Sequence, residues 1–257
     1  MRRRLATLGV LLVASACACT AQAELNQQGN LVVRFDSELS PKRLPRHRPV
    51  PIAVSVSGAV RDAHGGEVPQ LRRISVAINR AGQLEDRGLP TCEVGSIQPS
   101  TEAAARRICG DAIVGHGRVT VLARLDNQRS FTVKGRLLAF NGPRRGGHKL
   151  ILAQVYTKDP PGAFVLTFKL KRGKGIYGTV MTTTLPRRAW GWAYLTAFEM
   201  TLHRTYEAHG KSRSLLSAAC AAPEGFPGAV FPFAKATYGF DTGQTLTTTA
   251  LRTCKVR

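Results

Sequence analysis

The sequence lacks the short motifs by which several classes of enzyme are recognised. It contains no G-x-S-x-G nucleophile elbow, no H-E-x-x-H zinc motif and no phosphate-binding P-loop. The FDTG stretch at residues 240–243 matches the loop of aspartic proteases, but that catalytic centre requires two such loops and the sequence has one. Because Asp and Gly between apolar residues are typical of hairpin turns, we predict a turn at this stretch and name no catalytic residue.

Long apolar runs are absent beyond the N-terminus. No later stretch approaches the roughly 20 apolar residues of a membrane-spanning helix. At the N-terminus itself, three arginines precede an apolar run at residues 5–16, and an A-x-A pattern ends at Ala23. This pattern predicts a secretory signal peptide over residues 1–23 and a mature chain that is secreted or held at the cell envelope.

Two cysteines inside this leader leave an alternative open. A lipoprotein signal would lipidate Cys17 or Cys19 and anchor the protein to a membrane. The residue three positions before each of them is alanine (Ala14 and Ala16), where a lipidation signal carries a leucine-like residue. The sequence therefore favours the secreted protein, with the lipid-anchored protein as the alternative.

Only four cysteines remain in the mature chain: Cys92, Cys109, Cys220 and Cys254. An even number of cysteines in an oxidising compartment indicates disulfides. Three pairings are possible, and Cys92 with Cys109 and Cys220 with Cys254 is the pairing that closes the shortest loops. A zinc site would need a C-x₂-C or H-x₃-H spacing, which neither pair has. We therefore predict two structural disulfides, no metal and no cofactor.

The distribution of apolar residues is typical of β-strands. Ile74, Val76 and Ile78 alternate with small or polar residues in RISVAIN, and RVTVLARL shows the same period of two. Turn signals such as HGG, NGPRRGG and RGKG separate about ten such segments. Only STEAAARRICG predicts a helix, with Ser100 or Thr101 as its N-cap. The sequence thus predicts an all-β fold, a β-sandwich or jelly roll of about ten strands with one short helix.

Four short stretches carry a resemblance to other proteins. GLPTC, CGDAIVGHG, LLAFNG and SAACAAPEGF resemble stretches of an uncharacterised group of exported actinobacterial proteins, and the likeness covers most of the mature chain. It implies paired cysteines but no activity, because no functional residues are known for the group. Together with the absence of internal repeats and linkers, it favours a single β-sandwich domain over residues 24–257.

Acidic residues are scarce, and the deficit is uneven along the chain. Without the three leader arginines, 34 basic residues face 16 acidic residues, which gives a net charge of +18. Residues 24–126 carry 14 basic and 11 acidic residues, whereas residues 127–198 carry 13 basic residues and Asp159 as their one acidic residue. A basic surface of this size favours polyanions, although an arginine-rich composition also serves solubility alone.

Six of these basic residues lie at two predicted hairpin tips, in PRRGGHK and KLKRGKG. They form the candidate polyanion-binding site: Arg144, Arg145, Lys149, Lys171, Arg172 and Lys174. Loop tips at one end of a sandwich can converge, so we expect one patch. The expected partner is an anionic cell-envelope polymer or an acidic lipid surface, and no specific nucleic acid is expected.

Taken together, these features favour an exported, disulfide-stapled, strongly basic protein with a binding or structural role at the envelope or outside the cell. The alternative is a secreted hydrolase that acts on an envelope polymer. Its site would lie between the basic loops and Trp190 and Trp192, two aromatic residues that share a face of a predicted strand.

Overall fold

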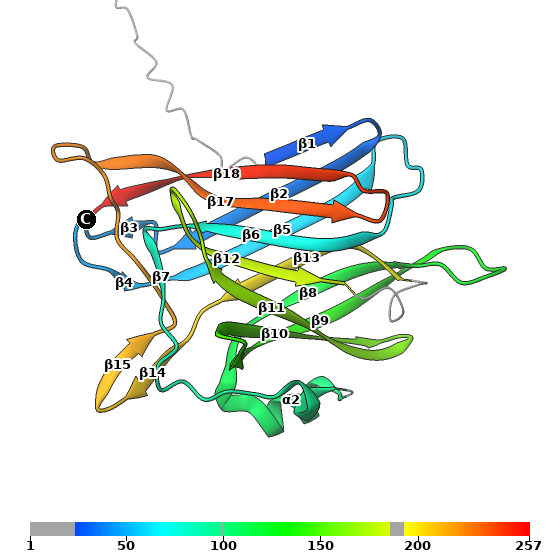
Figure 1. Cartoon of the computed structure of the whole chain (residues 1–257), viewed down its shortest axis with the longest axis horizontal. Helices are drawn as coiled ribbons and strands as arrows, with labels where there is room; N and C mark the ends of the chain where they lie inside the picture. The colour runs from blue at the N-terminus through cyan, green and yellow to red at the C-terminus, as the bar shows by residue number, and fades with distance from the viewer. Residues whose placement is uncertain (1–23, 99, 186–192) are drawn as a thin grey trace, which may run out of the picture.

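The computed structural model describes residues 24–98, 100–185 and 193–257, and these residues form an all-β fold (Figure 1). The predicted fold class is confirmed. The described residues contain 18 strands and two α-helices, more than the predicted ten strands and one helix, because several strands of two to five residues carry no period-two signal. The leader at residues 1–23 and the two tryptophans lie outside the described residues, so those predictions stay predictions.

The bounds of the elements follow the turn signals of the sequence. The elements are β1 (Glu24–Gln28), β2 (Leu31–Ser40), β3 (Arg43–Leu44), β4 (Val50–Pro51), β5 (Ala53–Asp62), β6 (Leu71–Asn79), β7 (Gly82–Leu84), α1 (Val94–Ile97), α2 (Glu102–Cys109), a 3-10 turn (Gly110–Ala112), β8 (Ile113–Ala123), β9 (Phe131–Arg145), β10 (His148–Lys158), β11 (Pro161–Arg172), β12 (Tyr177–Thr184), β13 (Ala193–Leu202), β14 (Thr205–Ala208), β15 (Lys211–Ser214), β16 (Leu216–Ala218), β17 (Gly228–Phe240) and β18 (Thr245–Val256). The FDTG stretch forms the predicted turn between β17 and β18, and Gly243 has a φ of 84° there.

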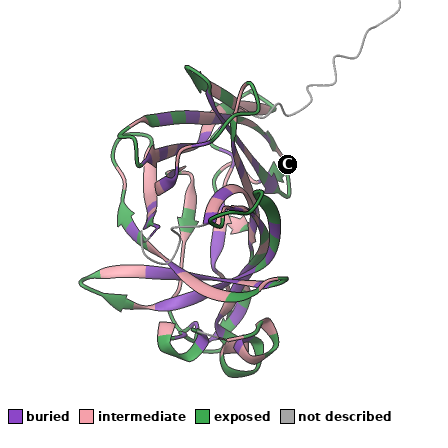
Figure 2. Ribbon diagram, turned by 90° about the vertical axis from the view of Figure 1, so that its right-hand side faces the viewer, coloured by how far each residue is buried: buried purple, intermediate pink, exposed green. Residues whose placement is uncertain are grey.

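Thirteen of the strands form one sheet in the order β1-β2-β5-β13-β8-β9-β10-β11-β12-β6-β17-β18-β3. The sheet curls until its first strands meet its last ones. Asn26 of β1 donates to the carbonyl oxygen of Thr247 on β18 at 2.7 Å, and the Tyr238 hydroxyl of β17 donates to the carbonyl oxygen of Arg34 on β2 at 3.4 Å. Figure 2 shows the curl from the side. The curl produces two layers, one built around β2, β5, β13 and β8 and the other around β12, β6, β17 and β18.

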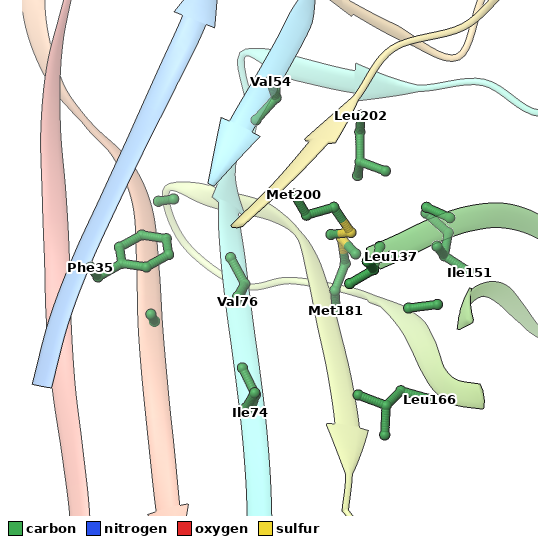
Figure 3. Packing of buried hydrophobic residues seen from close by; sticks show 14 of the residues in the cluster. Phe35, Val54, Ile74, Val76, Leu137, Ile151, Leu166, Met181, Met200 and Leu202 are labelled. Carbon is green, nitrogen blue, oxygen red and sulfur yellow. The ribbon is translucent and has the colours of Figure 1, made fainter. Parts of the chain in front are cut away.

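The main core lies between the two layers. Figure 3 shows Val54, Met200 and Leu202 of one layer pointing toward Val76 and Met181 of the other. All five are buried, as expected for the inward positions of alternating strands. The outward positions of these strands therefore form two separate outer faces that point away from each other.

Residues 137–142 of β9 and 150–155 of β10 differ from the other strands because both faces are buried there. A second apolar cluster joins Leu138, Phe140 and Leu152 on their outer face to Ile97 of α1 and Ala105 of α2. In Figure 1 α2 lies at the bottom, against these two strands. Runs such as LLAF and LILA, which are apolar at consecutive positions, are the sequence signal of a strand that is covered on both sides.

The predicted helix is confirmed as α2, which begins after Thr101. The Thr101 hydroxyl accepts a hydrogen bond from the Ala104 N–H at 3.2 Å, the usual contact of an N-cap residue. Ser100 has another role: its hydroxyl donates to the Ile97 carbonyl at 2.9 Å, and the side-chain amide of Gln154 on β10 donates to the Ser100 carbonyl at 2.9 Å. These bonds hold the helical segment against β10.

The structure contains the two disulfides that close the shortest loops. One joins Cys92 to Cys109 across 17 residues and fastens the segment before α1 to the end of α2. The other joins Cys220 to Cys254 across 34 residues and fastens the chain after β16 to β18. Two such bonds are typical of a protein that folds in a non-reducing compartment.

Candidate polyanion-binding surface

The β9–β10 hairpin tip carries three of the six predicted residues, and each of them forms an ion pair. Arg144 lies 3.6 Å from Asp86 and Arg145 lies 2.7 Å from Glu93, measured between guanidinium nitrogen and carboxylate oxygen. Lys149 also pairs with Asp86. Asp86 and Glu93, which precede β9 in the sequence, therefore neutralise much of the charge at this tip.

The acidic segment, residues 85–93, is fastened in place by the fold. The buried side-chain amide of Asn141 on β9 donates to the carbonyl oxygens of Leu89 at 3.2 Å and Pro90 at 3.0 Å. The Cys92 N–H donates back to the Asn141 carbonyl at 2.9 Å, and the disulfide to Cys109 fixes the end of the segment. The pairing of acids with this tip is thus built into the packing of the segment.

The β11–β12 hairpin tip carries the other three predicted residues in a different environment. Lys171, Arg172 and Lys174 are exposed, and none of them forms an ion pair with a described residue. The structure therefore divides the predicted patch into a neutralised half and a free half.

A hollow of about 360 Å³ lies beside this second tip. Arg172, Lys174 and Lys235 line it, together with Tyr177 and the hydroxyl-bearing Thr237, and none of its lining residues among those described is acidic. The Lys235 ammonium lies 5.2 Å from the centre of the Tyr177 ring, a cation–π distance. We call this hollow the basic hollow. Sequence analysis missed Lys235 because only the register of the sheet places β17 beside β12 through β6.

The basic hollow opens onto a wider outer face that we call the threonine face. Hydroxyl groups follow one another across its strands: Ser75 and Thr182 are hydrogen-bonded at 3.1 Å, and Thr237 and Thr247 at 3.1 Å. No acidic residue occurs in its three cross-strand rows. Read from β11 or β12 to β18, the rows are Lys171, Val180, Ala77, Lys235, Thr249; Lys169, Thr182, Ser75, Thr237, Thr247; and Thr184, Arg73, Gly239, Thr245.

A hollow of about 670 Å³ lies elsewhere and is lined by three carboxylates, Asp62, Glu67 and Asp241. Each has a structural partner. Glu67 forms an ion pair at 3.0 Å with the arginine that follows β8, and Asp241 accepts a backbone N–H at 3.1 Å. Backbone hydrogen bonds from Gly66 and His64 lower the pKa of Asp62. A catalytic general acid needs a raised pKa, which Asp62 does not have, and the ion pair and hydrogen bonds of the three carboxylates are contacts that stabilise turns.

Two further findings concern the described part of the chain. Within it, no group of three or more His, Cys, Asp and Glu side chains could hold a metal ion. No helix of residues 24–98, 100–185 and 193–257 is long and apolar enough to cross a membrane. The tryptophan platform of the hydrolase alternative, Trp190 and Trp192, lies outside the described residues.

Comparison with protein-family models, with curated proteins and with solved structures finds no match for this chain. Any functional conclusion must therefore come from the geometry of its surfaces.

Proposed function

We propose that this protein is exported and binds an anionic polymer of the cell envelope through the threonine face. The observation that carries the proposal is the basic hollow, where Arg172, Lys174 and Lys235 meet without an acidic neighbour among its described lining residues. The predicted leader and the two disulfides support the location outside the cytoplasm.

Binding follows from electrostatics and from the hydroxyl rows. Phosphate or carboxylate groups of a polymer release their counterions when the three cations of the hollow neutralise them, which favours binding at low salt. Neighbouring strands lie roughly 4.8 Å apart, so the hydroxyl pairs Ser75–Thr182 and Thr237–Thr247 follow one another at regular steps, and each pair keeps one O–H to donate to an oxygen of the polymer. The Tyr177 ring adds an apolar surface for a sugar ring or a polymer backbone.

A polymer fits the threonine face better than a membrane surface does. The three rows contain Val180 and Ala77 as their only aliphatic side chains. Two larger exposed apolar residues lie beside the rows, Ile176 at the β11–β12 tip and Leu251 two residues beyond Thr249 on β18, which is few for a surface that inserts among acyl chains. A membrane-surface site combines cations with large apolar side chains. The sequence also predicted an acidic lipid surface as a possible partner. The test below includes a result that would favour it.

The test compares two triple variants that each remove three cations. Arg172→Ala/Lys174→Ala/Lys235→Ala changes the basic hollow, and Arg144→Ala/Arg145→Ala/Lys149→Ala changes the neutralised tip. The measurement is the affinity for immobilised polyphosphate and for poly-glutamate as salt is raised. The slope of log affinity against log salt should fall in magnitude by about 2 to 3 in the first variant. The second variant should stay much closer to the wild type.

Circular dichroism and thermal unfolding check that both variants fold. Equal losses in the two variants, or a wild type that neither polymer retains at low salt, would contradict the proposal. Binding to vesicles with anionic headgroups in the absence of polymer binding would assign the surface to a membrane instead.

A further inference from the structure

A second cationic groove lies on the outer face of the other layer. Its volume is about 440 Å³. One cross-strand row runs along it through β2, β5, β13, β8 and β9 as Arg34, Ala59, Ala197, Thr120 and Lys134. Small side chains occupy the middle and long cations occupy both ends, which makes the row concave. Four strand spacings separate its ends, a span of roughly 19 Å.

The neighbouring row adds a third cation to this groove. Its residues are Asp36, Ser57, Glu199, Arg118 and Arg136. Two of them have partners outside the row. Asp36 forms an ion pair with Arg252 of β18, and a guanidinium nitrogen of Arg136 lies 3.2 Å from a carboxylate oxygen of Glu102 in α2. Arg118 and Glu199 are left facing the groove, which both of them line.

The cations of the groove are available to a ligand. Arg34, Arg118 and Lys134 are exposed, and none of the three forms an ion pair with a described residue. Glu199 is its one acidic lining residue among those described. Hydroxyl groups of Ser57 and Thr120 lie on the floor, as hydroxyls do on the threonine face.

The groove and the threonine face point in opposite directions. The inward residues behind the groove, Val56 and Met200, line the same apolar cavity as Ile74 and Met181, which lie behind the threonine face. Figure 3 shows Met200 and Met181 approaching each other from the two layers. A single straight segment of polymer cannot contact both outer faces, because the whole core lies between them.

We propose that this groove is a second binding site for the anionic polymer, so that one protein molecule bridges two polymer segments. The proposal rests on the proposed function, because it assigns the same class of ligand to a second face. It adds a consequence that one face alone does not have, which is the cross-linking of polymer chains.

The test is a capture experiment with the full mature chain. Wild-type protein is bound to immobilised polyphosphate, washed, and offered soluble fluorescent polyphosphate. We expect the bound protein to capture the labelled chain. The variant Arg34→Gln/Arg118→Gln/Lys134→Gln should stay bound to the immobilised polymer but capture at least about tenfold less label. Sedimentation velocity under the same conditions establishes whether the protein is a monomer.

Glu199→Gln provides a second test that needs no loss of function. Removing the one negative charge that lines the groove should raise label capture about two- to fivefold, since one exposed charge contact is worth under about 1 kcal/mol. The same change should leave binding to the immobilised polymer close to the wild type. An increase in capture is difficult to explain by misfolding.

The outcomes separate the two proposals. Failure of the wild type to bind immobilised polyphosphate contradicts the proposed function itself. Retention without capture, capture that is unchanged in the groove variant and in Glu199→Gln, or capture by dimers alone contradicts bridging and leaves the proposed function standing.

Discussion

The two basic hairpin tips look alike in sequence and differ in the folded protein. The β9–β10 tip presents Arg144 and Arg145 to carboxylates, whereas the β11–β12 tip presents Arg172 and Lys174 to solvent and to the basic hollow. The difference arises from residues 85–93, which are distant in sequence and lie against one tip alone. Local charge density in a sequence is therefore a poor measure of the charge that a ligand meets.

Removing the disulfide beside the acidic segment should change the difference between the two tips more than any other variant. Replacing Cys92 and Cys109 by alanine removes a 17-residue closure, and the free energy of unfolding should fall by about 3 kcal/mol. The loosened segment should also separate its acidic residues from Arg144 and Arg145, so affinity for polyphosphate at low salt should rise. Urea unfolding and polymer retention measure the two effects.

The second disulfide is the matched control. Replacing Cys220 and Cys254 should lower the free energy of unfolding by about 4 kcal/mol, because the loop of 34 residues is longer. This bond joins the chain after β16 to β18 and leaves the acidic segment fastened to β9, so polymer affinity should not rise. A rise in both variants would mean that general loosening, and not release of the acids, changes binding.

The fold could be predicted where burial is one-sided. Ile74 and Val76 are buried as their alternation predicts, because one face of β6 meets the core and the other meets solvent. Leu125 also fits the alternation in the sequence, yet it is 40% exposed because β8 ends at Ala123. The short α1 has only four residues and no side-chain cap hydrogen bond, so the sequence gives little indication of it.

The candidate site could be predicted in part. Lys171, Arg172 and Lys174 are exposed at a turn, and turn signals with basic residues are local features of the sequence. The pairing of Lys149 with Asp86 and the approach of Lys235 to the same tip depend on which strands are neighbours, and strand order is set by long-range packing.

Removing one carboxylate of the acidic segment, that of Asp86, tests the difference between the two tips with a smaller change. Asp86 is the shared partner of Arg144 and Lys149, and its side chain is only 12% exposed. Asp86→Asn removes that charge and leaves Lys149, 24% exposed, without its carboxylate. The free energy of unfolding should fall by about 1 to 3 kcal/mol, while affinity for polyphosphate at low salt should rise.

Glu93→Gln is the control for Asp86→Asn. The side chains of Glu93 and Arg145 are 55% and 65% exposed, so removing their ion pair should cost under about 1 kcal/mol. It should still raise polymer affinity, because it frees one cation at the same tip. If neither variant binds polymer more tightly than the wild type, the acids do not mask this tip.

Glu102, the first residue of α2, pairs with Arg136 of β9 and so reduces the charge that this strand offers to a polymer. Glu102 lies 2.8 Å from Arg106 and 3.2 Å from Arg136 of β9. Burial raises the pKa of Glu102, but the hydrogen bonds and charges of the two arginines outweigh it and hold the pKa below its ordinary value of 4.5. A carboxyl with a lowered pKa in the folded state stabilises that state above the ordinary pKa and loses this contribution as the pH falls through the folded-state pKa.

The smallest expected effect is the pH dependence of this contribution. Glu102→Gln should lower the free energy of unfolding by about 1 kcal/mol or less at pH 7, because Arg106 and Arg136 are half or more exposed. The difference from the wild type should persist down to about pH 4.5 and shrink as the pH falls toward the lowered folded-state pKa, below which Glu102 binds a proton in both states. Urea unfolding from pH 7 to pH 3 measures it. A difference that is the same at every pH would mean that Glu102 acts through packing, and that its charge does not hold Arg136.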